Sequence, residues 1–167
     1  MKTPSWEEYF LTICRGISQR SKDEDTKLGC VIADERHRIV STGYNSLPAG
    51  VDDNYWPTNR EAYLFYIDDI GIVEDNQDIP KGAEKITKYD VMAHAEINAL
   101  VSAARSLVGC TLYCTYLPCC ECAKAIITAG IKSIIYEKEN PRFKKSHAIA
   151  KKLFDQAGIK YGVWKLE

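Results

Sequence analysis

The sequence lacks a strong charge of either sign and lacks a long apolar run. Its 167 residues carry 22 Lys or Arg against 23 Asp or Glu, a net charge of −1, whereas domains that bind long nucleic acids are usually strongly basic. The longest uncharged run, residues 106–120, is too short and too polar to span a bilayer. Residues 1–10 contain a proline and two glutamates where a signal peptide needs apolar residues. We therefore expect a cytoplasmic protein that acts on a small molecule, without nucleic acid or membrane as a partner.

Internal repeats and low-complexity segments are also lacking, and the length favours one domain over residues 1–167. Within it, an inserted region at about residues 50–90 is loop-like and acidic. Long loops of this kind are usually lids, binding elements or interfaces. The aromatic-rich stretch 61–70 inside this region predicts a helix that docks on the body or on a neighbouring subunit.

The seven cysteines are an odd number, which argues against a complete set of disulfide bonds. Cys14, Cys30, Cys110 and Cys114 lie in apolar stretches, where free thiols pack as small hydrophobic groups. This pattern is typical of a reducing compartment.

Hydrophobic periodicity and turn residues predict an alternation of helices and strands. The expected helices cover residues 4–21, a segment that starts at His94 and uses apolar positions 97, 100, 101 and 104, residues 118–129, and residues 146–157. The expected strands cover 28–33 and 38–44, which form a hairpin, then 111–115, 131–136 and 159–164. This order predicts an α/β fold with a mixed, about five-stranded sheet, antiparallel in the hairpin, parallel after it, and covered by helices on both faces.

Two short motifs carry the chemistry: His94-Ala95-Glu96 and Pro118-Cys119-Cys120-Glu121-Cys122. Pro118 suits the first turn of a helix, on which Cys119 and Cys122 would share one face while Cys120 points roughly 100° away. One histidine and two cysteines suit a zinc ion with one coordination position left open for water. Such an ion lowers the pKa of the water to about 7, and Glu96 would shuttle protons rather than bind metal.

A structural zinc site or a redox pair is the alternative interpretation of the two cysteines. A structural site normally has four protein ligands, and the sequence offers no second Cys-x-x-Cys pair to complete one. The order of the His-x-Glu and Pro-Cys-x-x-Cys motifs is instead the signature of the zinc-dependent nucleobase deaminases.

Further stretches extend this similarity, namely 20–23, 43–45, 94–99, 122–124 and 129–132. Together with the zinc motif they resemble the deoxycytidylate (dCMP) deaminases of the cytidine deaminase superfamily. The resemblance implies a three-layer α/β/α fold and hydrolysis of dCMP to dUMP and ammonia, which supplies dUMP for dTMP synthesis. It also implies a hexamer that dCTP activates and dTTP inhibits, with Mg²⁺ on the triphosphate.

By the same resemblance, His94, Cys119 and Cys122 would bind zinc and Glu96 would be catalytic. Asn45 would contact the sugar, the Ala95 N–H would bind the base carbonyl, and Thr115, Tyr116 and Leu117 would border the ring. Lys22, Asp23, Gly43 and Ser46 are candidates for allosteric or phosphate contacts, and further cations for a 5′-phosphate are Arg60, Arg142, Lys144 and Lys145.

Two departures and several alternatives accompany this prediction. Ser46 stands where the family often has glycine, and no ligand set for a second zinc is visible, so we expect one zinc per chain.

The polar segment 22–25 is interpreted equally well as a solvated helix exit or as a functional element. Other deaminases of free cytidine or deoxycytidine, transfer RNA or single-stranded DNA share the chemistry, and a non-catalytic nucleotide-sensing zinc protein is an alternative of another class.

Overall fold

The computed structural model describes residues 3–67, 71–73 and 82–164, and its centre is a mixed five-stranded sheet. The strand order is β2 (Ile39–Tyr44), β1 (Gly29–Ala33), β6 (Thr111–Tyr116), β7 (Ser133–Lys138) and β8 (Lys160–Val163). β1 is antiparallel to both β2 and β6, whereas β6, β7 and β8 run parallel. The predicted hairpin and the predicted mixed sheet are therefore confirmed.

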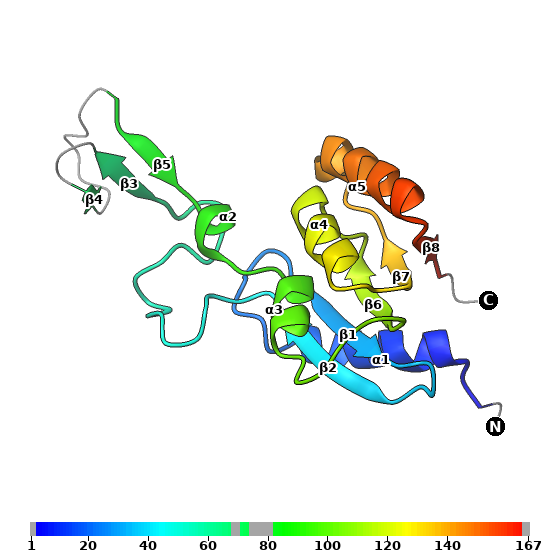
Figure 1. The fold of residues 1–167 in the computed structure, drawn as a ribbon. Coiled ribbons are helices and arrows are strands. Elements are labelled where there is room, and N and C mark those ends of the chain that lie inside the picture. The colour runs from blue at the N-terminus through cyan, green and yellow to red at the C-terminus, as the bar shows by residue number, and fades with distance from the viewer. Residues whose placement is uncertain (1–2, 68–70, 74–81, 165–167) are drawn as a thin grey trace.

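Helices cover both faces of this sheet (Figure 1). On one face, α1 (Trp6–Ser18) packs Phe10, Leu11 and Cys14 against the strands. On the other face lie α3 (Ala95–Val101), α4 (Cys120–Thr128) and α5 (Lys144–Ala157). The result is the three-layer α/β/α arrangement.

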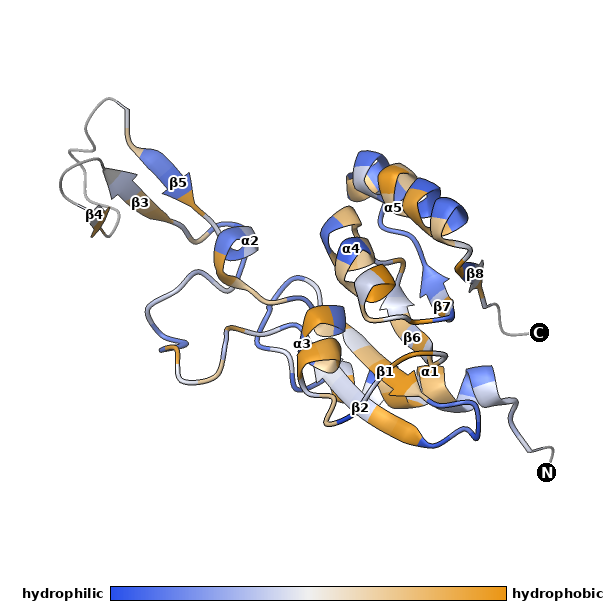
Figure 2. Ribbon diagram, viewed as in Figure 1, coloured by the Kyte–Doolittle hydropathy of each residue, from blue (hydrophilic) through white to orange (hydrophobic). Residues whose placement is uncertain are grey.

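β1 shows why the sheet needs both layers. All five of its residues are buried. Because side chains alternate across a strand, Cys30 and Ile32 belong to the core under α3 to α5, whereas Val31 and Ala33 belong to the core under α1. Figure 2 shows the apolar colouring of β1 and α3 in this central region.

The inserted region does not form the helix predicted over residues 61–70. It forms a second sheet in the order β4 (Gly71–Val73), β3 (Leu64–Ile67) and β5 (Glu84–Ile86), followed by the short helix α2 (Lys88–Val91). The helix prediction was wrong because strand pairing decides the structure of this stretch: Phe65 lies opposite Val73 of β4 on one side and Lys85 of β5 on the other. Residues 68–70 of the predicted helix lie outside the described part of the chain.

The helices nearest the motifs are shorter than predicted. α3 ends at Val101, whose side chain is 79% exposed, so positions 101 and 104 do not contribute to its buried face. α4 begins at Cys120, with Cys119 as the N-cap residue, and Pro118 therefore precedes the helix instead of opening it. A 3₁₀ turn, η1 (Pro141–Phe143), leads into α5, which ends at Ala157 and has Gly158, with a φ of 70°, as its C-cap residue.

The cysteines are all free, as predicted. Cys14, Cys30, Cys110 and Cys114 are buried. Burial raises the pKa of the Cys14 thiol to about 12, and it also raises the pKa values of Cys30 and Cys114. These thiols stay protonated at neutral pH and act as packing groups.

Gly43 allows β2 to approach α3 closely. A Cβ atom at this position would lie 2.2 Å from the carbonyl oxygen of Ala95 and 2.4 Å from the backbone nitrogen of Ala99. We expect Gly43→Ala to lower the free energy of unfolding by about 2 kcal/mol or more, because the strand and the helix must separate.

Thermal and urea unfolding would measure this effect. Gly16→Ala is the matched control, since a Cβ at Gly16 of α1 meets nothing within 4 Å and should stabilise the helix by about 1 kcal/mol. Equal stability of the two variants would contradict the close approach at Gly43.

Candidate active site

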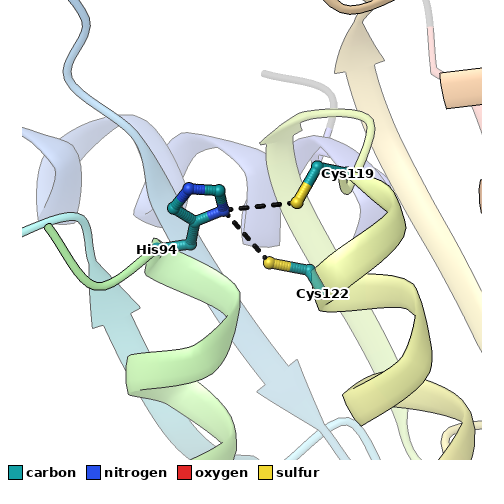
Figure 3. Close-up of side chains that lie close together, drawn as sticks. All are labelled: His94, Cys119 and Cys122. Atoms are coloured by element: carbon teal, nitrogen blue, oxygen red, sulfur yellow. Dashed lines mark hydrogen bonds between the residues drawn. The ribbon is translucent and has the colours of Figure 1, made fainter. Parts of the chain in front are cut away.

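The starts of two neighbouring helices bring the predicted metal ligands together. His94 is the N-cap residue of α3, Cys119 is the N-cap residue of α4, and Cys122 lies in the first turn of α4. Figure 3 shows the His94 ring pointing from α3 toward the two sulfur atoms on α4. The sequence places these residues about 25 positions apart along the chain, and the packing of α3 against α4 closes that distance.

The geometry of the three side chains fits a zinc ion. His94 Nδ1 lies 3.4 Å from Cys119 Sγ and 3.3 Å from Cys122 Sγ, and the three ligand atoms lie within 4.8 Å of one another. A nitrogen and a sulfur that share a tetrahedral zinc should be roughly 3.6 Å apart. Across residues 3–67, 71–73 and 82–164 no other group of three such side chains meets the same criterion.

Electrostatics favours a thiolate at Cys119, one of the three predicted ligands. Hydrogen bonds from Cys122 and then from His94 lower the pKa of the Cys119 thiol to about 4. The contact with Cys119 raises the pKa of His94 to about 9. A thiolate therefore already faces the imidazole, and a metal ion, which needs deprotonated ligands, would take the place of the imidazole proton.

Glu96 lies beside this triad in the first turn of α3 and is buried. Burial raises the pKa of its carboxyl group. Its Oε2 atom is the single buried side-chain nitrogen or oxygen without a hydrogen-bond partner in the described part of the chain. An unpaired buried oxygen is costly, so its presence next to the triad indicates a group that works on a ligand.

The triad and Glu96 open into a cleft formed by segments far apart in the sequence. Glu96, His94 and Cys119 lie in its wall, as do Asn45, Tyr116 and Leu117. The remaining lining residues are Asp23, Thr26, Leu28, Arg60, Lys88, Tyr89, Met92, Asn140, Phe143 and His147. The cleft is therefore bounded by the loop after α1, the inserted region, the end of β6 and the start of α5.

The sequence of this chain matches, over residues 4–138, the family described as the cytidine and deoxycytidylate deaminase zinc-binding region. This chain belongs to that family. The match contains both motifs and ends at the last residue of β7, so α5 and β8 lie beyond it. Membership agrees with the zinc-binding geometry of His94, Cys119 and Cys122.

Individual deaminases of the family are similar over most of the chain. The human deoxycytidylate deaminase is 34% identical over 157 residues, which cover 93% of this chain and 78% of the human protein. The deoxycytidylate deaminase of Mycobacterium phage D29 is 38% identical over 141 residues, which cover 84% of this chain and 100% of the phage protein.

A solved structure supports the fold. The dCMP deaminase from cyanophage S-TIM5, in complex with dCMP and dUMP, superposes with a TM-score of 0.65 at 23% identity and covers 98% of this chain and 100% of the phage chain. The predicted cytidine-deaminase-like fold is confirmed.

The predicted substrate residues take up different positions around the cleft. Asn45, Tyr116 and Leu117 line it. Thr115 is buried beneath the wall, where its hydroxyl accepts a hydrogen bond from the Gly29 N–H at 3.3 Å. Ala95 is the buried first residue of α3, directly between His94 and Glu96.

The four candidates for allosteric or phosphate contacts are distributed more widely. Lys22 forms an exposed ion pair with Asp53, and Gly43 is enclosed by α3. Ser46 forms a β-bridge with Ala93 and accepts a hydrogen bond from Asn98 at 3.2 Å. Asp23 lines the cleft and is 5% exposed, so the interpretation of segment 22–25 as a wholly solvated helix exit is wrong for this residue.

Lys88 is the cleft residue that sequence reasoning missed most completely. The sequence indicates only an acidic, loop-like region around Lys88, yet the side chain of Lys88 is 2% exposed and pairs with Asp23. Thr87 is the N-cap residue of α2, and its backbone N–H and its hydroxyl both donate to Asp90 Oδ2. The Thr-x-x-Asp spacing could have predicted a helix start. The partners of Lys88 lie more than 60 positions away, and no local pattern indicates them.

Aromatic and histidine residues at the cleft were missed as well. Tyr89 of α2 and Phe143 of η1 form an edge-to-face pair with ring centroids 6.1 Å apart. His147 of α5 is buried at the same wall.

Within the described segments, none of the helices has the length and apolar character that a membrane span requires.

The metal ligands can be tested with cysteine variants of one helix. We expect Cys119→Ala and Cys122→Ala to lose most of the zinc, because two remaining ligands hold the ion weakly. Cys120→Ala is the matched control, since its Sγ contacts Glu121 and lies outside the triad. Metal analysis of the purified proteins should find about one zinc per chain in the wild type and in Cys120→Ala, and a loss of zinc from Cys120→Ala would refute the assignment.

Proposed function

We propose that this chain catalyses the zinc-dependent hydrolysis of dCMP to dUMP and ammonia. The observation that carries the proposal is the buried, unpaired Oε2 atom of Glu96 beside the His94, Cys119 and Cys122 triad, in the wall of a cleft. Deoxycytidylate deaminases that are 34 to 38% identical over most of the chain support the choice of dCMP. We further propose a single deaminase domain over residues 1–167, into which the region 50–90 is inserted.

The residues divide into two roles. His94, Cys119 and Cys122 would hold the zinc ion, which when bound lowers the pKa of a water molecule to about 7. Glu96 accepts a proton from the attacking water and delivers it to the ring nitrogen next to the reacting carbon, and a second proton passes to the leaving amine. The carbon gains the water oxygen and loses ammonia, so the product is the uracil base.

The raised pKa of Glu96 suits both parts of this role. Burial disfavours the charged carboxylate, which makes Glu96 a stronger base than an exposed glutamate. A carboxyl group with a raised pKa accepts a proton more readily and can return it within one turnover.

The cleft wall would hold the rest of the nucleotide. We propose that Asn45 contacts the sugar, that the Ala95 N–H binds the base carbonyl, and that Tyr116 and Leu117 border the ring, with Thr115 supporting them from beneath. Among the predicted cations, Arg60 is our candidate for the 5′-phosphate because it lines the cleft. Its guanidinium is oriented by the Tyr89 hydroxyl at 3.3 Å and by the Thr26 hydroxyl at 3.0 Å.

The role of Glu96 is tested by a neutral, isosteric variant. We expect Glu96→Gln to keep the fold and the zinc but to lose turnover by roughly 10²- to 10⁴-fold, because the amide cannot shuttle protons. Glu121→Gln is the control, since Glu121 is exposed and pairs with Lys124. Ammonia release and zinc content should be measured together. Undiminished turnover in Glu96→Gln would exclude the assigned role.

We propose that the enzyme is a hexamer and that dCTP, with Mg²⁺, activates it while dTTP inhibits it. The basis is the similarity to the deoxycytidylate deaminases over the 20–23 and 43–45 stretches and the zinc motifs. A sigmoidal dependence of rate on dCMP that becomes hyperbolic with dCTP would indicate a shift between two states.

Substrate choice and regulation are tested in one experiment. Ammonia release is measured from dCMP, dCTP, deoxycytidine and a single-stranded oligonucleotide, each alone and with dCTP or dTTP as effector. We expect turnover of dCMP, raised by dCTP and suppressed by dTTP. Turnover confined to deoxycytidine or the oligonucleotide would assign the zinc chemistry to another branch, and no turnover in a zinc-loaded protein would favour a nucleotide-sensing role.

A further inference from the structure

Lys88 is a buried cation in the cleft wall, and its surroundings point to a role beyond stability. Its side chain is 2% exposed, and its Nζ atom donates to Asp23 Oδ1 at 2.6 Å and to Asp25 Oδ2 at 2.9 Å. α2 is held at its start by Asp90 Oδ2, which accepts a hydrogen bond from the Thr87 N–H at 2.7 Å. The ammonium group is thus held by two carboxylates, and the helix that carries Lys88 is held at its start.

The Asp23 carboxylate connects Lys88 to Asn45. Its Oδ1 atom accepts from Lys88 and from the backbone N–H groups of Asp25 at 2.9 Å and Thr26 at 2.8 Å. Its Oδ2 atom accepts from Asn45 Nδ2 at 3.2 Å. Because Oδ1 has three donors, the plane of the carboxylate is set and Oδ2 must face the Asn45 amide.

The amide of Asn45 therefore has one orientation. Its Nδ2 atom donates to Asp23 and to the Thr26 carbonyl at 2.9 Å, and its Oδ1 atom accepts from the Leu28 N–H at 2.7 Å. A flipped amide would place an oxygen against the Asp23 and Thr26 oxygens. Both N–H donors are used, whereas an amide oxygen has two lone pairs, so the hydrogen-bonding capacity that Asn45 retains at the cleft is that of an acceptor.

An acceptor at this place selects one group of the proposed substrate. Ionised dCMP has two donors: the exocyclic amine, which must lie at Glu96 and the metal ligands to react, and the hydroxyl at C3′ of the sugar. The oxygen at C5′ is esterified and C2′ bears only hydrogen. The 3′-hydroxyl is therefore the donor available to Asn45 Oδ1.

We propose that Lys88 and Asp23 are positioning residues that hold the Asn45 amide with its oxygen toward the cleft, so that the enzyme selects substrates with a free 3′-hydroxyl. This inference rests on the proposed function. It assigns to the inserted region, through Lys88, a part in substrate specificity, and it explains why a lysine is buried in a wall that could have been apolar.

The test compares dCMP with 2′,3′-dideoxycytidine 5′-monophosphate, which lacks the 3′-hydroxyl. We expect the wild type to prefer dCMP in kcat/KM by roughly tenfold or more, since without the hydroxyl the second lone pair of Asn45 Oδ1, beside the one that accepts from the Leu28 N–H, is left without a donor in the closed site. Asn45→Ala, Lys88→Met and Lys88→Gln should each reduce this preference toward one. A general distortion of the site would lower both rates and leave their ratio unchanged.

Lys85→Met is the matched control, because Lys85 belongs to β5 and lies over the Tyr63 ring, 3.7 Å from its centroid. It should keep the wild-type preference. Lys88→Gln retains a donor of similar reach without the charge, so it guards against loss of the fold in Lys88→Met, and thermal unfolding checks both proteins.

Binding of dUMP and of its 3′-deoxy analogue to the zinc-loaded proteins, measured by calorimetry, gives the same ratio without turnover. A wild type that binds both equally would overturn the contact between Asn45 and the hydroxyl. A preference that Asn45→Ala loses but folded Lys88→Gln and Lys88→Met keep would overturn the role of Lys88. Failure to release ammonia from dCMP would instead refute the proposed function. The ratio of the two binding constants would still test the roles of Asn45 and Lys88.

Discussion

The active site depends on α3 and α4 beginning side by side on one face of the sheet. This arrangement places His94, Cys119 and Cys122 within reach of one ion and sets Glu96 two residues after His94, the N-cap residue of α3. The sheet enforces it, because β6 leads through Pro118 directly into α4, and the close approach of β2 at Gly43 holds α3 in place. A shift of either helix by a fraction of its 5.4 Å pitch would separate the ligands.

The sequence predicts the part of the site that is local along the chain. His94-Ala95-Glu96 and Pro118 to Cys122 each specify a short segment, and zinc chemistry supplies the reason to bring them together. The predictions are weaker where two periodicities compete. The stretch 61–70 contains enough aromatic residues to suggest one face of a helix, but strand pairing decides its structure, with Phe65 opposite both Val73 and Lys85.

Lys88 shows the limit of sequence reasoning more sharply. A lysine among acidic residues reads as solvated charge, and its burial follows only from the fold, which brings α2 against the loop after α1. A buried ion pair does little for stability by itself, since desolvation offsets much of the attraction. Its value is in orientation: three donors fix the Asp23 carboxylate, which in turn fixes an amide at the cleft.

The same network bears on how a nearly neutral protein can recognise a charged nucleotide. Lys88 and Arg60 are the Lys and Arg side chains that line the cleft, and each forms an ion pair, Lys88 with Asp23 and Asp25 and Arg60 with Asp25. The cleft therefore has little net positive field with which to attract polyanions. Under the function proposed above, selection of a small nucleotide comes from donors and acceptors held in fixed directions. The proposed ones are Asn45 for the sugar, Arg60 for the phosphate and Glu96 for the base. Such a site rejects a wrong ligand because polar groups of the site or the ligand are then left without a hydrogen-bond partner. The buried Lys88 and Asp23 matter to specificity because they hold one of these groups in a fixed direction.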